Sequence, residues 1–289
     1  MLEFLEKYEA FYPGEDEIRT EVNRIKAMAG ELKTEETLKT IFGLIDLTTL
    51  NTTDNHPLVK EMCRKVNEFP KAFPALPNVA AICVYPPFVN TLKEVRTAKF
   101  NIASVGGCFP SSQSYIDIKL SETAMIAEEG ADEIDIVISV GSFLDGDYST
   151  VFNEIQLIRE TVDDVHLKTI LETGALENYE LIWDASVISM EAGSDFIKTS
   201  TGKMPVAATP EAAFIMCKAI KAYYEQTGKK IGFKPAGGIS ISDEALVYYA
   251  IVKEVLGEEW INPELFRIGA SRLANNLLTD ITGTETKYF

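Results

Sequence analysis

Eight short apolar segments, separated by stretches with helical periodicity, constrain the fold of this 289-residue chain most strongly. The predicted strands are residues 41–47, 79–85, 102–107, 133–139, 167–173, 196–200, 231–235 and 266–270. Strands that alternate with helices are typical of a parallel sheet, because parallel strands need a crossover connection. Eight strands are the number that closes a (β/α)8 TIM barrel, which is therefore the predicted fold. An open doubly wound sheet is the alternative.

Capping residues predict where two of the helices begin and end. Thr209 is a predicted N-cap, with Pro210 at the first helical position and Gly228 just past the end. Ser242 is a second predicted N-cap, followed by acidic residues in the first turn, and Gly257 is the predicted stop. These signals place one helix between each pair of the last three predicted strands.

The segment before the first predicted strand is rich in charged residues and has the pattern of one or two helices. We therefore expect an N-terminal helical extension at residues 1–38 and a barrel catalytic domain at residues 39–289.

Composition narrows the classes of partner and the compartment. The formal net charge is −17, from 27 basic and 44 acidic residues, which argues against nucleic-acid and anionic-membrane partners. The four cysteines are widely spaced and form no CxxC pair, so reduced thiols are expected. The N-terminal residues lack a signal-peptide pattern, and no apolar run is long enough to span a membrane. A cytoplasmic protein is the expectation.

Polar residues near the carboxyl ends of the strands predict the position of an active site, because TIM-barrel sites lie at that face. They are Asp46, Cys83, Asp135, Lys168, Lys198 and Lys234. The three lysines fall on consecutive strands about 4.8 Å apart. Repulsion and desolvation would lower the pKa of at least one of them. A shift of about three units costs ~4 kcal/mol and yields an amine able to attack a carbonyl. Ion-paired lysines with a structural role are the alternative.

Glycine-rich segments after the last two strands predict a phosphate site. "PAGG" at 235–238 follows the seventh strand, and "GAS" at 269–271 follows the eighth. In TIM barrels these two loops frequently bind phosphate through backbone N–H groups. Ordinary tight turns are the alternative. His56 and His166 are the only histidines and lie in unrelated contexts, so neither a histidine-based metal site nor a histidine-based catalytic triad is expected. No cofactor is expected.

Six segments, in order along the chain, resemble the deoxyribose-phosphate aldolase family. They are "DLTTLN" (46–51), "AAICVYP" (80–86), "GADEIDIVI" (130–138), "FIKTSTGK" (196–203), "GFKPAGG" (232–238) and "FRIGAS" (266–271). The resemblance covers roughly residues 40–289 and implies a class I aldolase with a (β/α)8 barrel.

The resemblance also implies roles for individual residues. Lys198 matches the lysine that forms the Schiff base, and Lys234 matches the second lysine, which lowers the pKa of the first. Asp135 matches the acid that relays protons through a water. Asp46, Thr48 and Cys83 fall around the aldehyde pocket, and the positions where the family holds the substrate phosphate are Gly202, Lys203, Gly237, Gly238 and Ser271. Lys168 and Gly269 are further predicted substrate-binding residues.

Three positions depart from the usual pattern of that family. Arg272 stands where many members have a second serine, and Ser240 stands where many carry an arginine. Tyr288 is penultimate here, whereas some members end in a tyrosine that reaches the site. Phosphate affinity and the contribution of the C-terminal tyrosine are therefore in question.

The activity implied by the resemblance is a lyase reaction in deoxyribonucleoside catabolism. 2-Deoxy-D-ribose 5-phosphate would be cleaved reversibly to D-glyceraldehyde 3-phosphate and acetaldehyde. The expected partners are thus a small sugar phosphate and aldehydes, with a homo-oligomer, a dimer, as a further expectation. Another lysine-dependent barrel aldolase and a sugar-phosphate-binding barrel without turnover are the alternatives.

Overall fold

The computed structural model describes residues 3–176 and 178–289 and contains one sheet of eight parallel strands. The strand order is β7-β6-β5-β4-β3-β2-β1-β8. Two isolated bridges close the sheet by joining Phe233 of β7 to Phe266 before β8, and Ala236 after β7 to Gly269 of β8. This closure confirms the predicted (β/α)8 barrel, and the open-sheet alternative is wrong. The strands are β1 Ile45–Thr48, β2 Ala81–Val84, β3 Asn101–Val105, β4 Glu133–Val137, β5 His166–Ile170, β6 Phe196–Lys198, β7 Gly232–Lys234 and β8 Ile268–Ala270.

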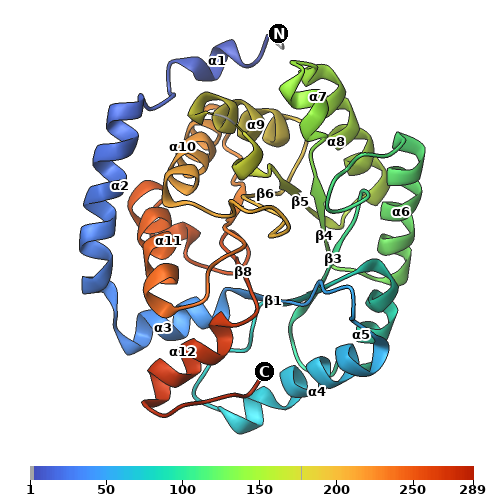
Figure 1. Cartoon of the computed structure of the whole chain (residues 1–289), viewed down its shortest axis with the longest axis vertical. Coiled ribbons are helices and arrows are strands. Elements are labelled where there is room, and N and C mark those ends of the chain that lie inside the picture. Colours follow the sequence, from blue (N-terminus) through green and yellow to red (C-terminus); the bar gives the residue numbers. More distant parts are fainter. Residues whose placement is uncertain (1–2, 177) are drawn as a thin grey trace.

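Helices surround the barrel on its outer side (Figure 1). The α-helices are α1 Glu6–Glu9, α2 Glu15–Ala29, α3 Glu35–Gly43, α4 His56–Ala72, α5 Val89–Val95, α6 Ile116–Glu129, α7 Val140–Leu144, α8 Tyr148–Val162, α9 Tyr179–Glu191, α10 Pro210–Thr227, α11 Ser242–Val255 and α12 Leu273–Thr282. Short 3₁₀ turns are η1 Gly30–Leu32, η2 Pro86–Phe88, η3 Thr173–Ala175 and η4 Glu258–Trp260. Within residues 3–176 and 178–289, every helix is too short or too polar to cross a bilayer.

The first strand begins later than predicted, because its apolar lead-in belongs to a helix. Residues 41–43 close α3, whose N-cap Thr34 accepts a hydrogen bond from a backbone N–H three residues on. Leu38, Ile41 and Phe42 share the buried face of α3 at helical spacing. A short apolar run does not by itself distinguish a strand from the end of a buried helix.

Of the two predicted helix caps, one is confirmed and one is wrong. Thr209 caps α10 by accepting a hydrogen bond from the Ala212 N–H at 3.1 Å. Ser242 is instead the first residue of α11, and its buried hydroxyl has no hydrogen-bond partner among the described residues. Glu244 replaces it, because its carboxylate accepts the backbone N–H groups of Ser240 and Ile241.

The N-terminal helices lie against the outside of the barrel helices. The apolar face of α2 packs on α10 and α11 (Figure 1), and the Tyr8 hydroxyl donates to Glu191 of α9 at 2.6 Å. Ion pairs Arg24–Glu254 and Lys26–Glu211 add contacts from α2 to the same two helices. The predicted boundary at residue 38 lies within α3, which packs on α11 and α12.

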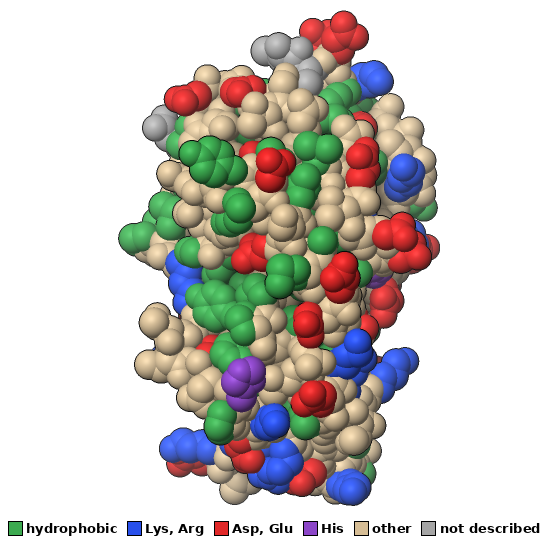
Figure 2. All heavy atoms as spheres, turned by 90° about the vertical axis from the view of Figure 1, so that its right-hand side faces the viewer, with side chains coloured by type: hydrophobic (Ala, Val, Ile, Leu, Met, Phe, Trp, Pro, Cys, Tyr) green, Lys and Arg blue, Asp and Glu red, His purple; other side chains and the backbone are tan. Residues whose placement is uncertain are grey.

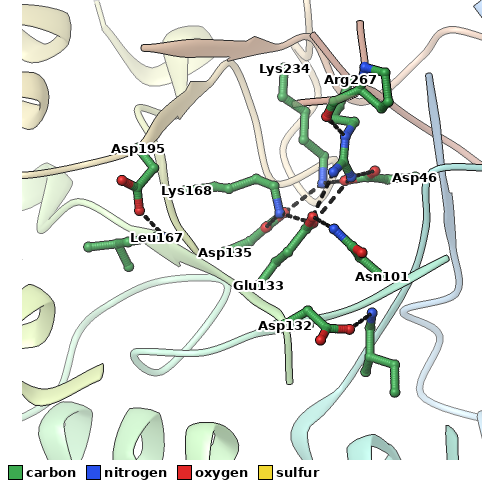
Figure 3. A network of polar contacts seen from close by, with 12 residues as sticks. Asp46, Asn101, Asp132, Glu133, Asp135, Leu167, Lys168, Asp195, Lys234 and Arg267 are labelled. Atoms are coloured by element: carbon green, nitrogen blue, oxygen red, sulfur yellow. Dashed lines mark hydrogen bonds and ion pairs between the residues drawn. The ribbon is translucent and has the colours of Figure 1, made fainter. Parts of the chain in front are cut away.

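Two equivalent aspartates fix the strands that carry the site. The segments "GADEID" and "GSDFIK" repeat a glycine with positive φ, at 130 and 193, followed two residues later by Asp132 and Asp195. Asp132 accepts the backbone N–H of Ile102, and Asp195 accepts that of Leu167 at 2.8 Å (Figure 3). Each aspartate is also paired with an arginine. Three residues further along the chain, β4 presents Asp135 and β6 presents Lys198.

Candidate active site

A cavity of about 570 Å³ opens at the carboxyl ends of the strands. The predicted site residues that line it are Thr48, Lys198, Gly202, Lys203, Gly237, Gly238, Gly269 and Ser271. The other predicted residues are buried beneath the lining, inside the barrel; they are Asp46, Cys83, Asp135, Lys168 and Lys234. Strand ends and the loops after them therefore form the surface of the cavity, and a charged layer supports it.

Lys198 and Lys234 lie side by side on adjacent strands, and both amines contact the Asp135 carboxylate. They are direct register partners on β6 and β7. The Lys198 Nζ lies 2.7 Å from Asp135 Oδ2, and the Lys234 Nζ lies 2.8 Å from the same oxygen. Lys234 also contacts Asp46, whereas Lys198 pairs with Asp135 alone among the described carboxylates. Of the two amines, only Lys198 reaches the cavity.

The surroundings shift the pKa values of Lys198 and Lys234 in opposite directions. Burial lowers the pKa of Lys198, and the nearby Lys234 cation lowers it further, against the attraction of Asp135. Burial opposes the charge on Lys234 too, but Asp135 and Asp46 outweigh it and hold the Lys234 pKa above its ordinary value. Burial would raise the pKa of Asp135, yet the lysines around it hold that pKa well below its ordinary range. Lys234 thus stays charged, and Lys198 is the amine that loses its proton most readily.

Lys168 and Cys83 do not contribute to the cavity surface. The Lys168 Nζ contacts Glu133 and lies 3.1 Å from Asp135 Oδ1, and these acids raise its pKa despite its burial. The Cys83 thiol is fully buried inside the barrel, where burial raises its pKa to about 11. Both side chains lie behind the lining, so a role in direct substrate contact stays a prediction.

Glu133 and Arg267 are charged residues inside the barrel that were missed in the sequence. Arg267 donates to Asp46 Oδ1 at 2.7 Å and to Glu133 Oε1 at 2.7 Å (Figure 3). Asn101 donates to the same Glu133 oxygen at 2.7 Å. The available signal was a charged residue within an apolar strand segment: Glu133, in addition to Asp135, in "EIDIV", and Arg267 in "FRIGA". The prediction used only residues at the carboxyl ends of the strands.

The loop after β6 is held by a buried glutamate. Glu172 adopts a left-handed conformation at φ 54° and accepts both the backbone N–H and the hydroxyl of Thr201. The Thr201 hydroxyl oxygen in turn accepts the backbone N–H of Lys203 at 3.0 Å. The Lys203 ammonium donates to the Leu50 carbonyl across the cavity. These bonds hold a cationic side chain in the lining of the cavity that Lys198 also lines.

Two close backbone approaches require glycine at predicted site positions. Gly237 has φ +86°, and a Cβ there would lie 2.7 Å from the Ala207 side chain and 3.2 Å from Gly202 Cα. A Cβ on Gly269 would lie 2.8 Å from Ala236 and 3.3 Å from Lys234 Cε. Gly269 therefore leaves room for the second lysine in addition to lining the cavity.

The N-terminus of α12 is better suited to an anion than that of α11. Glu244 already accepts the amides of Ser240 and Ile241 at the start of α11. Arg272 is the N-cap of α12, where no side chain of residues 3–176 and 178–289 accepts the first N–H groups, and it lines the cavity. The local arrangement thus offers unfilled backbone donors and a guanidinium on one side of the cavity.

The C-terminal residues flank the cavity. The Tyr288 hydroxyl donates to the Lys65 carbonyl of α4 at 2.9 Å, and its ring packs edge-on against Phe69. Asn275 accepts the backbone N–H groups of Tyr288 and Phe289. Phe289, rather than Tyr288, lines the cavity.

Comparison with known proteins agrees with this geometry. A model of the DeoC/LacD family of aldolases matches residues 40–257. The chain belongs to this family. The barrel described above is therefore that of a DeoC/LacD family aldolase.

Similar proteins carry a more specific name. A Homo sapiens protein named deoxyribose-phosphate aldolase is 43% identical over 245 residues, covering 81% of this chain and 77% of the human protein. A Caenorhabditis elegans protein that bears the same name provisionally is 45% identical over 266 residues, covering 91% of this chain and 87% of its own. The solved structure of QR15, described as an aldolase, is 27% identical with a TM-score of 0.68 and covers 83% of this chain and 96% of its own.

Proposed function

We propose that this DeoC/LacD family aldolase cleaves 2-deoxy-D-ribose 5-phosphate to D-glyceraldehyde 3-phosphate and acetaldehyde through a Schiff base on Lys198. The observation that carries the proposal is the Lys198 amine, which lines the cavity and has a lowered pKa beside Asp135 and Lys234. The substrate is inferred from the name of the human relative, and the anion-binding geometry near Arg272 supports it.

In the proposed reaction, the neutral Lys198 amine attacks the C1 aldehyde of the open-chain sugar, and loss of water gives an iminium. The iminium accepts electrons while the C2–C3 bond breaks and the C3 hydroxyl loses its proton, which releases D-glyceraldehyde 3-phosphate. The remaining enamine takes a proton at carbon. Hydrolysis of the resulting iminium then releases acetaldehyde and restores the amine.

Asp135 has the contacts of a proton relay. Its Oδ2 lies within 2.8 Å of the Lys198 amine, which would carry the Schiff base, and of the Lys234 amine buried beside it. Its pKa is held well below the ordinary range, so a proton that it accepts passes on quickly instead of remaining on the carboxyl. Lys234 stays charged, so it is the cation beside Asp135 while protons are exchanged.

Borohydride reduction tests the proposed function. We expect the chain incubated with acetaldehyde and borohydride to gain one ethyl group, located by mass spectrometry on Lys198, and deoxyribose 5-phosphate to yield acetaldehyde without reduction. A reduced adduct on another lysine would overturn the assignment. An adduct with acetaldehyde but no cleavage of the sugar would indicate an aldolase for a different aldehyde pair. No adduct with either compound would indicate a sugar-phosphate-binding barrel.

Arg272 is proposed to bind the substrate phosphate in place of the arginine absent at Ser240. We expect Arg272→Ala to raise the KM for deoxyribose 5-phosphate at least about tenfold, because a charge-assisted hydrogen bond contributes roughly 1.5–3 kcal/mol. The KM for unphosphorylated deoxyribose should change little, and Arg19→Ala on the exposed face of α2 is the matched control. Equal effects of Arg272→Ala on both sugars would contradict a phosphate contact.

The surface of α6 is proposed to mediate a homodimer. Tyr115, Ile118 and Met125 are 84%, 53% and 64% exposed and follow one helix face at spacings of three and seven. Figure 2 shows this side of the molecule, with hydrophobic side chains gathered across its middle. Analytical ultracentrifugation of the wild-type chain and of Met125→Lys tests the proposal. A monomeric wild type, or a dimer that the substitution leaves intact, would contradict it.

A further inference from the structure

The charged side chains inside the barrel form a closed ring of alternating sign. Each of three cations contacts two of three carboxylates, and each of these carboxylates contacts two of the same three cations (Figure 3). We call this set the ionic ring; in order of contact it consists of Asp46, Arg267, Glu133, Lys168, Asp135 and Lys234, which closes on Asp46. With every member ionised, the ionic ring carries no net charge.

Lys198 is attached to the ionic ring but is not a member of it. Its amine contacts one carboxylate oxygen, Asp135 Oδ2, which the ring already shares with Lys234. The titratable and charged groups that surround Lys198 inside the barrel are Asp46 of β1, Cys83 of β2, Glu133 and Asp135 of β4, Lys168 of β5, Lys234 of β7 and Arg267 before β8. β3 adds the uncharged amide of Asn101. The three carboxylates of the ionic ring are thus fully matched by its three cations before Lys198 is counted.

Charge balance decides which amine is neutral. The ring side chains are at most 1% exposed, so a net charge among them is costly. A proton on Lys198 adds one positive charge to a neutral, buried set, whereas a proton lost from Lys168 or Lys234 would leave two carboxylates short of a partner. We propose that Arg267 and Glu133, which do not line the cavity, are positioning residues that set the charge on Lys198 by keeping the ionic ring neutral. This inference rests on the proposed role of Lys198.

The proposal predicts shifts of opposite sign for two neighbouring residues. Arg267→Gln leaves the ring with a net charge of −1, so Lys198 should retain its proton to higher pH. Glu133→Gln leaves the ring at +1, so Lys198 should lose its proton at lower pH. The ionic ring is neutral again in the double variant, and Arg267→Lys leaves the net charge of the ring unchanged. If Arg267 and Glu133 had only a structural role, each substitution would damage the protein. The two single variants would then not shift the pH at which Lys198 loses its proton in opposite directions.

Trace acetylation of Lys198 measures its protonation without turnover. The wild type and the variants are labelled with acetic anhydride from pH 6 to 11, and the Lys198 peptide is compared by mass spectrometry with that of Lys71, an exposed lysine in the same sample. Because only the neutral amine reacts, the pH of half-maximal labelling reports the charge on Lys198. Cleavage of deoxyribose 5-phosphate is measured in parallel, so loss of the proposed activity and loss of the charge effect are distinguished.

We expect the labelling midpoint to rise by at least about one pH unit in Arg267→Gln and to fall by at least about one unit in Glu133→Gln, each a tenfold change in neutral amine at a given pH. Arg267→Lys and the double variant should lie near the wild type. Shifts of the same sign in both single variants, or a displaced midpoint in the double variant, would overturn the proposal. If a single variant does not fold, the double variant decides: an unchanged midpoint supports charge balance, and a changed one excludes it.

Discussion

Lys198→Ala is expected to lower the rate of deoxyribose 5-phosphate cleavage by at least about a thousandfold, because Lys198 lines the cavity and burial beside the Lys234 cation lowers its pKa. Without that amine, no iminium can form to accept the electrons of the breaking C–C bond. Steady-state cleavage, coupled to detection of D-glyceraldehyde 3-phosphate, measures the loss.

The same substitution should leave the fold intact. Asp135 keeps its contacts with Lys168 and Lys234, so the change leaves no buried carboxylate without a partner. Thermal unfolding followed by circular dichroism should show a midpoint close to that of the wild type. Lys230→Ala, which removes an exposed lysine paired with Glu259, is the matched control for both measurements. Cleavage by Lys198→Ala within tenfold of the wild-type rate would disprove the Schiff-base assignment.

The placement of the lysines could be predicted from the sequence because two rules act together. An apolar strand followed by a lysine places the charged group at a strand end, and parallel strands bring those ends to one face of a barrel. Lys198 and Lys234 accordingly face each other in register. The segments after β7 and β8 were located by the same rules, and Gly237 and Gly269 border the predicted cavity.

The partners inside the barrel could not be assigned from the sequence, since they depend on how the barrel closes. Arg267 reaches Asp46 and Glu133 only because β8 lies beside β1 and the interior is narrow enough for a guanidinium to bridge it. Periodicity assigns a residue to a strand but not to a partner across the interior. The predicted cap of α11 was wrong because Glu244, rather than Ser242, accepts backbone N–H groups at the start of the helix.

Lys234→Leu is expected to shift the pH dependence of cleavage to higher pH as well as reduce activity near neutrality. The Lys234 cation helps to lower the pKa of Lys198, so its removal raises that pKa. Asp46 and Asp135 also lose a shared counter-ion, which strengthens their hold on a proton at Lys198. The neutral fraction of Lys198 then falls at pH 7 and recovers as the pH rises through the new pKa. We expect a loss of at least about a hundredfold at pH 7 and a recovery approaching tenfold per pH unit above it.

The pH dependence of kcat/KM between pH 6 and 10 separates an electrostatic role of Lys234 from the alternatives. A uniform loss at every pH would mean that the ammonium acts through substrate contact or proton donation instead. Lys234→Arg is the matched variant, because it keeps the charge but presents a planar group where Gly269 leaves little room. If charge is the main contribution, Lys234→Arg should keep its activity maximum near that of the wild type even where the rate falls. If Lys234→Leu and Lys234→Arg shift the pH dependence of kcat/KM by the same amount, the geometry of the Lys234 side chain, rather than its charge, affects Lys198. The neutral state of Lys198 must then depend on burial alone.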